Sequence, residues 1–520
     1  MKNRLIQTFI AIFCILPLFS EIHAQAKIIC GTHDLEELDK RQTENMEFLA
    51  RNPLQQRAPI YIPIAIHLVG DNNGVGRASE YKVIEQMNQL YKDYVKMGAI
   101  FYLRDSTFYY VNSTRIYNTP ESSVSVDSMN RLKKGNCINV FVSKTATPPS
   151  TSSIGTTLGY YSPTYDYLVV KIDQINKYSG TLSHELGHFF SLPHTFRGWD
   201  FEPWDQATHG TTVSALSPGG VPNERVNGGM GFNCTGTSEA NRGWDRICDT
   251  PPDYNFGFGW TGCSEFTTVV NDPAGVRIDP QENNMMGYFI GCSSYIFTDD
   301  QSALKVADYN SSRRNYLRTY RRTPNTNTIS TAPNLVFPIN QELVDPYNDI
   351  TLRWDPVPNA GFYVVEVSRS SSMDVDYKVY TTKNPFLRLR NLLANRPDYR
   401  WRVTPYNEAY FDVVSSPIQR FKTGIVNSVS QIEEISYMDI VPNPISQGKS
   451  IEIWMNNLAN FQGNISMINA AGVKVFERAN QFFNKGDDKI LIPSDNMAKG
   501  LYFLNINTTE GIITKKLILQ

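Results

Sequence analysis

A short stretch of this 520-residue chain combines three histidines and a glutamate at a spacing that could hold a metal ion: His184, Glu185, His188 and His194. The first two histidines are four residues apart, so on a helix both imidazoles lie on one face with the glutamate beside them. Three neutral imidazoles leave one position of a zinc ion open to water, as catalytic zinc sites do. Zinc lowers the pKa of that water, and the Glu185 carboxylate can accept its proton.

The third histidine reaches the metal only if the chain turns sharply after the helix. Pro193 cannot continue a helix, which places the turn at about Ser191. A non-glycine residue in the left-handed backbone of such a turn costs on the order of 1 kcal/mol. The alternative is an amphipathic helix whose histidines are merely packed, but chance would produce the full pattern in fewer than roughly one in ten thousand such chains.

This pattern is typical of zinc-dependent endopeptidases and resembles the metzincin clan. Metzincins also carry a methionine turn beneath the zinc, and residues 284–288 (N-M-M-G-Y) resemble the form of that turn in the pappalysin family. The resemblance implies that Met286 is an apolar floor for the histidines and that Tyr288 hydrogen-bonds the oxyanion. A packed phenol is the alternative for Tyr288. The sequences at 195–196, 248–252 and 297–301 are also similar to those of the pappalysin family, so the resemblance extends over about residues 58–322.

The first 24 residues have the features of a secretory signal peptide. Two basic residues precede an apolar run from Leu5 to Phe19, and small residues follow. That run is too short for a comfortable membrane span, and no later stretch is long enough, so we expect an exported, soluble protein. A net charge of −2 and a pI near 6.4 indicate neither nucleic acid nor an anionic membrane as a partner.

Cysteine usage agrees with export. Four of the six cysteines beyond the signal cluster between the zinc motif and the region of the methionine turn, where Gly, Asn, Asp and Pro are frequent. We expect disulfides to substitute there for a hydrophobic core. Four cysteines allow three pairings, and the family resemblance favours Cys263 with Cys292 and Cys234 with Cys248. A second zinc site is the alternative, although no C-x-x-C spacing supports it.

Two further sites rest on the resemblance. Residues 244–250 resemble the pappalysin calcium loop, which implies Asp245 and Thr250 as ligands together with main-chain carbonyls; oxygen ligands suit a hard cation. An ordinary solvated acidic turn is the alternative. Residues 30–34 (C-G-T-H-D) resemble the cysteine switch of metzincin zymogens, in which a thiolate fills the open position of the zinc.

We therefore expect Cys30 to keep a precursor latent. Charged and polar residues 35–57 would form an exposed tether, and Arg51 or Arg57 offers a cleavage point for activation. The alternative is a disulfide from Cys30 to Cys137 that pins the N-terminus.

A chain of this length predicts several domains. We expect a signal peptide (1–24), a propeptide (25–57), a zinc metalloprotease domain (58–322), a linker (323–333), a fibronectin type III-like domain (334–424) and a secretion sorting domain (432–520). The protease domain is expected to be α+β, with a twisted mixed sheet backed by helices and two all-β sandwiches after it. Strands are predicted at 60–69, 139–142 and 167–170, a helix around 83–94, and a helix from the capping box at 298–301 to about Tyr320. His67 and His209 lack partner spacing and are expected to be structural.

The C-terminal third carries the other two resemblances. Alternating strands around Trp354, Tyr363 and Trp401 resemble a fibronectin type III domain, expected to be a spacer, with substrate or glycan binding as the alternative. P-N-P at 442–444, G-L-Y at 500–502 and the basic-apolar end at 515–519 resemble a type IX secretion sorting domain; another plain sandwich is the alternative. The resemblance implies a Gram-negative source, export through the periplasm, the type IX machinery as a partner, and a secreted or surface-attached product.

Two functions compete for the whole chain. One is a secreted zinc endopeptidase acting on proteins or peptides; the other is a surface adhesion protein with a degenerate protease domain. The intact Glu185 favours the enzyme, and the spacing of His194 argues against a zinc clan with a distal glutamate ligand. In arginine-preferring pappalysins an acidic residue follows the cysteine after the methionine turn, whereas Ser293 stands here. We expect no strong arginine preference at P1′ and an apolar pocket formed by Tyr288, Tyr295 and Phe297.

Overall fold

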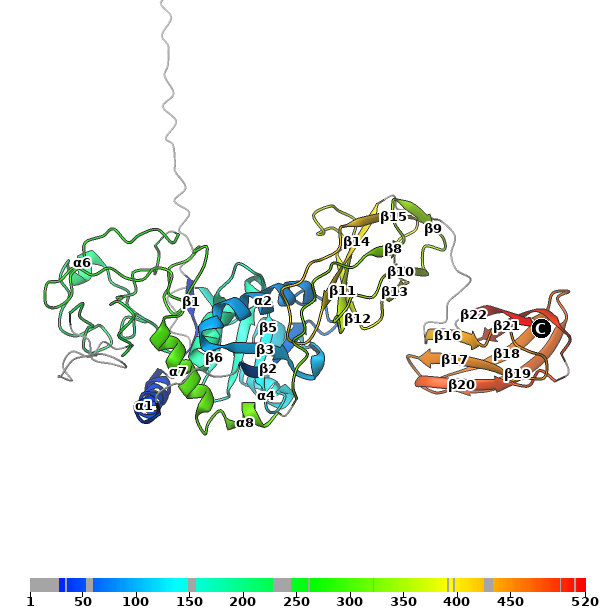
Figure 1. The fold of residues 1–520 in the computed structure, drawn as a ribbon, viewed down its shortest axis with the longest axis horizontal. Helices are drawn as coiled ribbons and strands as arrows, with labels where there is room; N and C mark the ends of the chain where they lie inside the picture. The colour runs from blue at the N-terminus through cyan, green and yellow to red at the C-terminus, as the bar shows by residue number, and fades with distance from the viewer. Residues whose placement is uncertain are drawn as a thin grey trace, which may run out of the picture. The chain divides into compact units, whose positions relative to one another are not determined.

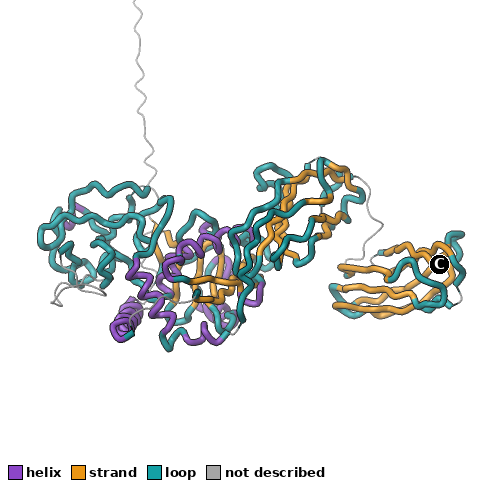
Figure 2. The backbone as a smooth tube through the Cα atoms, viewed as in Figure 1, coloured by secondary structure: helices purple, strands orange, loops and turns teal. Residues whose placement is uncertain are grey.

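The computed structural model describes residues 28–32, 35–52, 59–147, 156–227, 245–260, 262–320, 322–390, 392–395, 398–424, 434–495, 497–508 and 511–520. The predicted signal peptide, Arg57 and Cys234 lie outside these residues. The chain divides into two compact units, one comprising Met1–Asn327 with Asn407–Asp412 and the other Thr328–Tyr406 with Val413–Gln520. Helices gather in the first unit, and strands and loops make up the described part of the second (Figure 2).

A seven-stranded mixed sheet forms the centre of the first unit (Figure 1). Its order is β1-β6-β7-β5-β2-β3, and β4 also pairs with β2. Strand β6 is antiparallel to β7, and the remaining pairs are parallel. The strands are β1 (Ile28–Cys30), β2 (Ile60–Gly70), β3 (Ala99–Leu103), β4 (Tyr109–Asn112), β5 (Ile138–Ser143), β6 (Thr156–Ser162) and β7 (Tyr167–Lys171). The three predicted strands are confirmed as β2, β5 and β7.

Helices surround this sheet, and α5 carries the first two histidines. Gly159 in β6 lets α5 approach closely, because a Cβ there would lie 2.9 Å from Thr181 Cγ2 and 3.0 Å from Glu185 Cγ. The α-helices are α1 (Leu35–Arg51), α2 (Glu80–Asp93), α3 (Thr114–Asn118), α4 (Ser123–Leu132), α5 (Thr181–Phe189), α6 (Gln206–His209), α7 (Asp299–Asn310) and α8 (Asn315–Thr319). The 3-10 helices are η1 (Val95–Met97), η2 (Arg104–Ser106) and η3 (Ile172–Gln174). The predicted helix around residues 83–94 is confirmed as α2.

The long helix predicted to reach Tyr320 is wrong in its length. Thr298 and Gln301 form the predicted capping box, but α7 ends at Asn310 and α8 follows after a break. The break turns Arg314 into the interior, where it forms an ion pair with the buried Asp308. A continuous helix would have lost that pair.

The exposed tether predicted for residues 35–57 is also wrong for its described part. Residues Leu35–Arg51 form α1, which packs against α7 and buries Leu38, Arg41, Gln42, Asn45 and Leu49. Three of these five residues are polar, so the buried face of the helix lacks the apolar periodicity that sequence patterns detect.

The segment between α5 and α7 has few regular elements but does contain a core of its own. The core is mostly aromatic and consists of Phe196, Trp199, Val213, Tyr254, Phe256, Phe266, Val270, Ile278 and Phe289. Disulfides therefore do not replace a core here, contrary to expectation. Cys263 and Cys292 form the disulfide that the family resemblance implied. Cys248 is also disulfide-bonded, and its pairing with Cys234 stays a prediction because Cys234 lies outside the described residues.

The described part of the second unit contains four antiparallel or mixed sheets. Two have the orders β13-β10-β8 and β12-β11-β14-β15-β9, and two have the orders β16-β17-β20 and β19-β18-β21-β22. The predicted strands around Trp354, Tyr363 and Trp401 are β10, β11 and β14, and the rings of Trp354 and Trp401 lie 6.3 Å apart.

The strands of this unit are β8 (Leu335–Phe337), β9 (Glu342–Val344), β10 (Ile350–Trp354), β11 (Phe362–Ser368), β12 (Lys378–Thr382), β13 (Phe386–Leu389), β14 (Tyr399–Tyr406), β15 (Gln419–Thr423), β16 (Ile435–Val441), β17 (Ile451–Asn457), β18 (Phe461–Asn469), β19 (Lys474–Phe483), β20 (Gly486–Ile492), β21 (Gly500–Asn507) and β22 (Ile512–Leu519). Within the described ranges, no helix is both long and apolar enough to span a membrane.

Candidate active site

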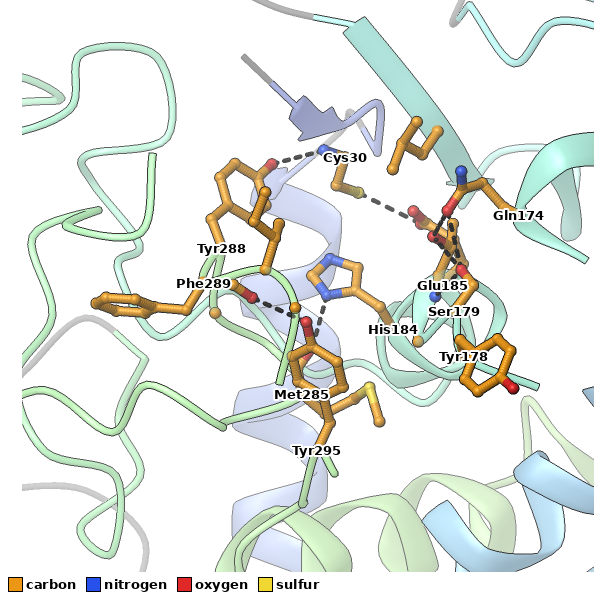
Figure 3. Close-up of a pocket in the computed structure, with 16 residues that line it drawn as sticks. Cys30, Gln174, Tyr178, Ser179, His184, Glu185, Met285, Tyr288, Phe289 and Tyr295 are labelled. Atoms are coloured by element: carbon orange, nitrogen blue, oxygen red, sulfur yellow. Dashed lines mark hydrogen bonds between the residues drawn. The ribbon is translucent and has the colours of Figure 1, made fainter. Parts of the chain in front are cut away.

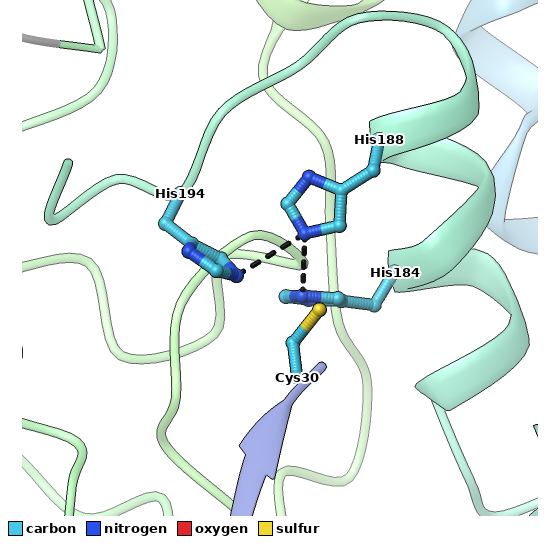
Figure 4. Close-up of side chains that lie close together, drawn as sticks. All are labelled: Cys30, His184, His188 and His194. Atoms are coloured by element: carbon cyan, nitrogen blue, oxygen red, sulfur yellow. Dashed lines mark hydrogen bonds between the residues drawn. The ribbon is translucent and has the colours of Figure 1, made fainter. Parts of the chain in front are cut away.

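The three histidines of the motif converge at one point (Figure 4). The Nε2 atom of His188 lies 3.2 Å from Nε2 of His184 and 3.1 Å from Nε2 of His194. All three side chains are buried. The Cys30 thiol joins them, and the four ligand atoms all lie within 4.8 Å of one another.

The other ring nitrogen of each histidine is held by a hydrogen-bond acceptor. His184 Nδ1 lies 2.7 Å from the Met285 carbonyl, His188 Nδ1 lies 2.8 Å from the Leu192 carbonyl, and His194 Nδ1 lies 2.7 Å from Asp200 Oδ1. These contacts fix the tautomer in which Nε2 carries the free lone pair. Burial lowers the pKa of His184 to about 3, so this ring is neutral and able to bind a metal.

The arrangement fits zinc by its chemistry and its spacing. Four ligands at Zn–N distances of about 2.05 Å in a tetrahedron place neighbouring nitrogens about 3.3 Å apart. The two observed Nε2–Nε2 distances of 3.1 and 3.2 Å agree with that figure. Neutral imidazoles with anchored Nδ1 atoms and one adjacent thiol are the donor set that zinc prefers.

The turn between the second and third histidines has the predicted geometry. Ser191 adopts a left-handed backbone with φ of 67°. Before the turn, Gly187 faces Met286, whose sulfur would lie only 2.4 Å from a Cβ at position 187. Met286 is fully buried, and its sulfur lies directly against the helix that carries the first two histidines.

Glu185 and Tyr288 lie beside the histidines (Figure 3). Glu185 is 1% exposed, and burial raises the pKa of its carboxyl to about 7, although hydrogen bonds from Thr32 and Cys30 oppose the rise. The Tyr288 ring lies 5.1 Å from the His194 ring. Its hydroxyl accepts a hydrogen bond from the Cys30 amide at 2.8 Å.

Residues 30–32 occupy the space in front of these groups. The Thr32 hydroxyl donates to Glu185 Oε2 at 2.9 Å and accepts from the Tyr161 amide at 2.9 Å, and Cys30 Sγ lies 3.3 Å from the same carboxylate oxygen. Strand β1 runs parallel to β6, with Cys30 opposite Gly159. Sequence reasoning found Cys30 but missed Thr32 and Asp200. Both Cys30 and Cys137 are free thiols, so the alternative of a disulfide between them is wrong.

The predicted calcium ligands lie together away from the histidine cluster. Asp245 Oδ2 accepts a hydrogen bond from the Thr250 hydroxyl at 2.6 Å, and Oδ1 accepts one from the Ile247 amide at 3.0 Å. Both predicted ligands are buried, so the alternative of a solvated turn does not describe this loop. Burial, with a smaller effect from the nearby Asp249 and Asp253 carboxylates, raises the pKa of Asp245 to about 8, although hydrogen bonds from Thr250 and Ile247 oppose the rise.

A cavity of about 240 Å³ opens beside His184 and Glu185 (Figure 3). Tyrosines and apolar side chains dominate its wall, and Glu185 is the only Asp, Glu, Lys or Arg in the described lining. The predicted pocket residues Tyr288 and Tyr295 line it, but Phe297 does not: its ring packs against Tyr94 in the interior.

Comparisons with known proteins address separate parts of the chain. Residues 439–520 match the family model of the secretion system C-terminal sorting domain, which indicates that the protein is exported. No curated protein matches the sequence.

Three solved structures show limited similarity. A mutant of promirolysin from Tannerella forsythia is 18% identical over 56% of this chain and 97% of its own, with a TM-score of 0.35. The FN1-FN3 domains of chicken CNTN1 are 13% identical over 36% of this chain and 67% of their own, with a TM-score of 0.16. The fn3 domain of human collagen alpha-1(XX) chain is 16% identical over 21% of this chain and 97% of its own, with a TM-score of 0.15.

Proposed function

We propose that the chain is a zinc-dependent endopeptidase of the pappalysin type, secreted or attached to the surface after export by a type IX secretion system. The observation that carries this proposal is the convergence of three histidine Nε2 atoms with every Nδ1 atom anchored, next to a buried glutamate. The sorting-domain match at residues 439–520 supports the route of export.

In the proposed reaction, the zinc ligands, Glu185 and Tyr288 each have a separate role in peptide hydrolysis. A zinc ion bound by His184, His188 and His194 would supply a Lewis acid and lower the pKa of a bound water. Glu185 accepts a proton from the attacking water and passes it to the leaving amine. The Tyr288 hydroxyl lies in the same space and is suited to donate to the developing oxyanion.

In the proposed latent precursor, residues 30–32 block each of these groups. Cys30 lies at the position of a fourth metal ligand, and because burial raises the pKa of its thiol, a bound cation would be needed to hold it as a thiolate. Thr32 holds the Glu185 carboxylate, and the Cys30 amide holds Tyr288. Strand β1 pairs with the edge of β6, where an extended substrate could otherwise add as a strand.

Glu185→Gln tests the activity. The substitution keeps the shape of the side chain but removes the base, so the activated enzyme should lose casein or gelatin cleavage by at least about 100-fold. Glu85→Gln, which alters a carboxylate on α2 paired with Lys177, is the matched control and should retain activity. Cleavage that survives Glu185→Gln contradicts the enzymatic mechanism. Wild-type protein that binds zinc but cleaves nothing would favour the adhesion function instead.

Latency is tested with uncleaved precursors. Cys30→Ala should be only partly active, because Thr32 still holds Glu185, whereas the double variant with Thr32→Val should be active or degrade itself before any cut after α1. Thr319→Val, an exposed threonine in α8, is the control. A double variant that stays latent would show that residues 30–32 do not block the site.

The cavity supports an uncharged side chain at P1′. Because the described wall holds no carboxylate other than the proposed base Glu185, a buried guanidinium would be costly, so a peptide library should show apolar or aromatic preference. Tyr295→Asp places a carboxylate in the wall and should raise the relative rate with arginine. A dominant P1′ arginine in the wild type contradicts this assignment.

Calcium remains a second proposed metal, with Asp245 and Thr250 as its side-chain ligands. Support comes from their burial together and from the raised pKa of Asp245, since a cation would relieve the cost of burying that charge. Calcium added to zinc-loaded, calcium-free enzyme should raise Tm, and Asp245→Asn should remove the effect. A wild-type Tm that ignores calcium contradicts the site.

A further inference from the structure

A buried ion pair holds the C-terminal end of α5. Arg314 and Asp308 are 0% and 1% exposed, and Arg314 Nε donates to Asp308 Oδ2 at 2.8 Å. Arg314 Nη2 also donates to the Phe189 carbonyl, one of the last-turn carbonyls that lack a partner within a helix. The guanidinium carbon lies 3.7 Å from the centre of the Phe189 ring. The pair therefore satisfies the helix end and fixes its position.

The second oxygen of the same carboxylate holds the turn. Asp308 Oδ1 accepts a hydrogen bond from the Ser191 hydroxyl at 2.7 Å. Ser191 is 1% exposed and left-handed, a conformation that favours glycine because it has no Cβ. A side chain at this position is useful only if it makes a contact that glycine could not make, and the bond to Asp308 is such a contact.

This turn determines the placement of two histidines. The Leu192 amide donates to the Gly187 carbonyl at 3.0 Å, and the Leu192 carbonyl accepts from His188 Nδ1 at 2.8 Å. Two residues later the chain supplies His194. A displacement of Ser191 would therefore shift the acceptor that orients His188 and the path of the chain to His194.

We propose that Asp308 and Arg314 are positioning residues for the metal site, acting through Ser191 and the end of α5. The inference rests on the proposed zinc function. Buried ion pairs are often no better for stability than apolar residues of the same volume, so stability alone does not account for a pair at this place. Its two hydrogen bonds, one to the Phe189 carbonyl at the helix end and one from Ser191 in the turn, do account for it.

The test compares variants of the activated enzyme by zinc affinity, in competition with a chelator, and by kcat and KM separately. Ser191→Ala keeps the strained backbone without the hydroxyl and should weaken zinc binding by about 10–100-fold, with kcat falling more than KM rises. Ser191→Gly relieves the strain and should remain within about threefold of wild type. Asp308→Asn should weaken zinc binding by about 10–100-fold with Ser191 present, and at least about threefold less in the Ser191→Gly background.

Arg314→Lys is a further test, and Arg313→Lys is its matched control. Lysine cannot make the forked contacts of Arg314, so zinc affinity should fall. Among the described residues, Arg313 donates to Glu37 and Glu44 of α1, and its replacement should leave the activated enzyme unchanged.

Two results would overturn the proposal: wild-type zinc affinity in Ser191→Ala, or an equal cost of Asp308→Asn in the serine and glycine backgrounds. Both Ser191 variants leave the buried charges intact, so they decide the matter even where Asp308→Asn does not fold. A wild-type enzyme that binds no zinc would instead defeat the proposed function itself.

Discussion

Gly187→Ala tests how closely the methionine turn packs against the helix of the metal site. Gly187 lies in α5 between two of the histidines, and a Cβ there would be 2.4 Å from Met286 Sδ and 3.2 Å from Met286 Cε. Non-bonded heavy atoms of this kind rest about 3.8 Å apart, so the methionine or the helix would have to move by about 1.4 Å.

Two opposing effects determine the size of the loss. In an exposed helix, alanine in place of glycine would stabilise by about 1 kcal/mol. Overpacking a closed core costs about 1–3 kcal/mol, and Met286 is fully buried with α5 against it. The overlap is severe, so we expect a net loss of about 1–2 kcal/mol. At about 2–4 °C per kcal/mol for a unit of this size, Tm should fall by about 2–8 °C.

Scanning calorimetry of the zinc-loaded enzyme, together with zinc competition, measures this effect. Gly135→Ala is the control, because a Cβ at that position meets no atom within 4 Å. The cost of Gly187→Ala should shrink in a Met286→Ala background, where the obstructing sulfur is gone. A Gly187→Ala enzyme with an unchanged or raised Tm and wild-type zinc affinity would refute the packing argument.

Three further outcomes are expected. Asp200→Ala should weaken zinc binding by about 10–100-fold in chelator competition, because His194 loses the acceptor on Nδ1, while the exposed Asp279→Ala should not change it. Removing the metal with a chelator should abolish hydrolysis and lower Tm, and added zinc should restore both. Burial lowers the pKa of His67 to about 4, so the unfolded chain takes up a proton between about pH 6.5 and 4 that the folded chain does not. Stability is therefore lost as pH falls through that window, by at most about 3 kcal/mol. The His67 ring stacks on Phe141, so His67→Phe can keep that packing without titrating and should reduce the loss in acid unfolding curves.

The metal ligands could be predicted because local chain geometry alone brings them together. Helical spacing pairs His184 with His188, and Pro193 forces the turn at Ser191. The groups that orient the histidines could not be predicted in the same way. Two of the three acceptors are main-chain carbonyls, which every residue type supplies, and Asp200 carries no spacing signal that separates it from other loop carboxylates.

The helix missed at residues 35–51 and the helix predicted too long after residue 298 share a cause. The inner face of α1 is largely polar, and its partners come from distant parts of the chain: Arg41 contacts Tyr161, and Asn45 contacts Asp308. The end of α7 is set by Arg314, which pairs with the nearby Asp308 but also contacts Asp166 and the Phe189 carbonyl, both of them remote in sequence. Local patterns carry no information about such contacts until the tertiary structure is known.

The polar character of α1 determines how the proposed inhibitor would leave. The helix is held mainly by hydrogen bonds and by ion pairs such as Asp39 with Arg197 and Glu44 with Arg313. While the backbone is intact, α1 and Cys30 face their sites at a high effective concentration, so weak contacts suffice to keep the site closed. After a cut beyond α1 that advantage is lost, so the same contacts no longer suffice to retain the free fragment. The same helix can thus inhibit strongly while it is attached to the chain and weakly once it is cut off. A single cleavage after α1 would therefore be enough to activate the enzyme.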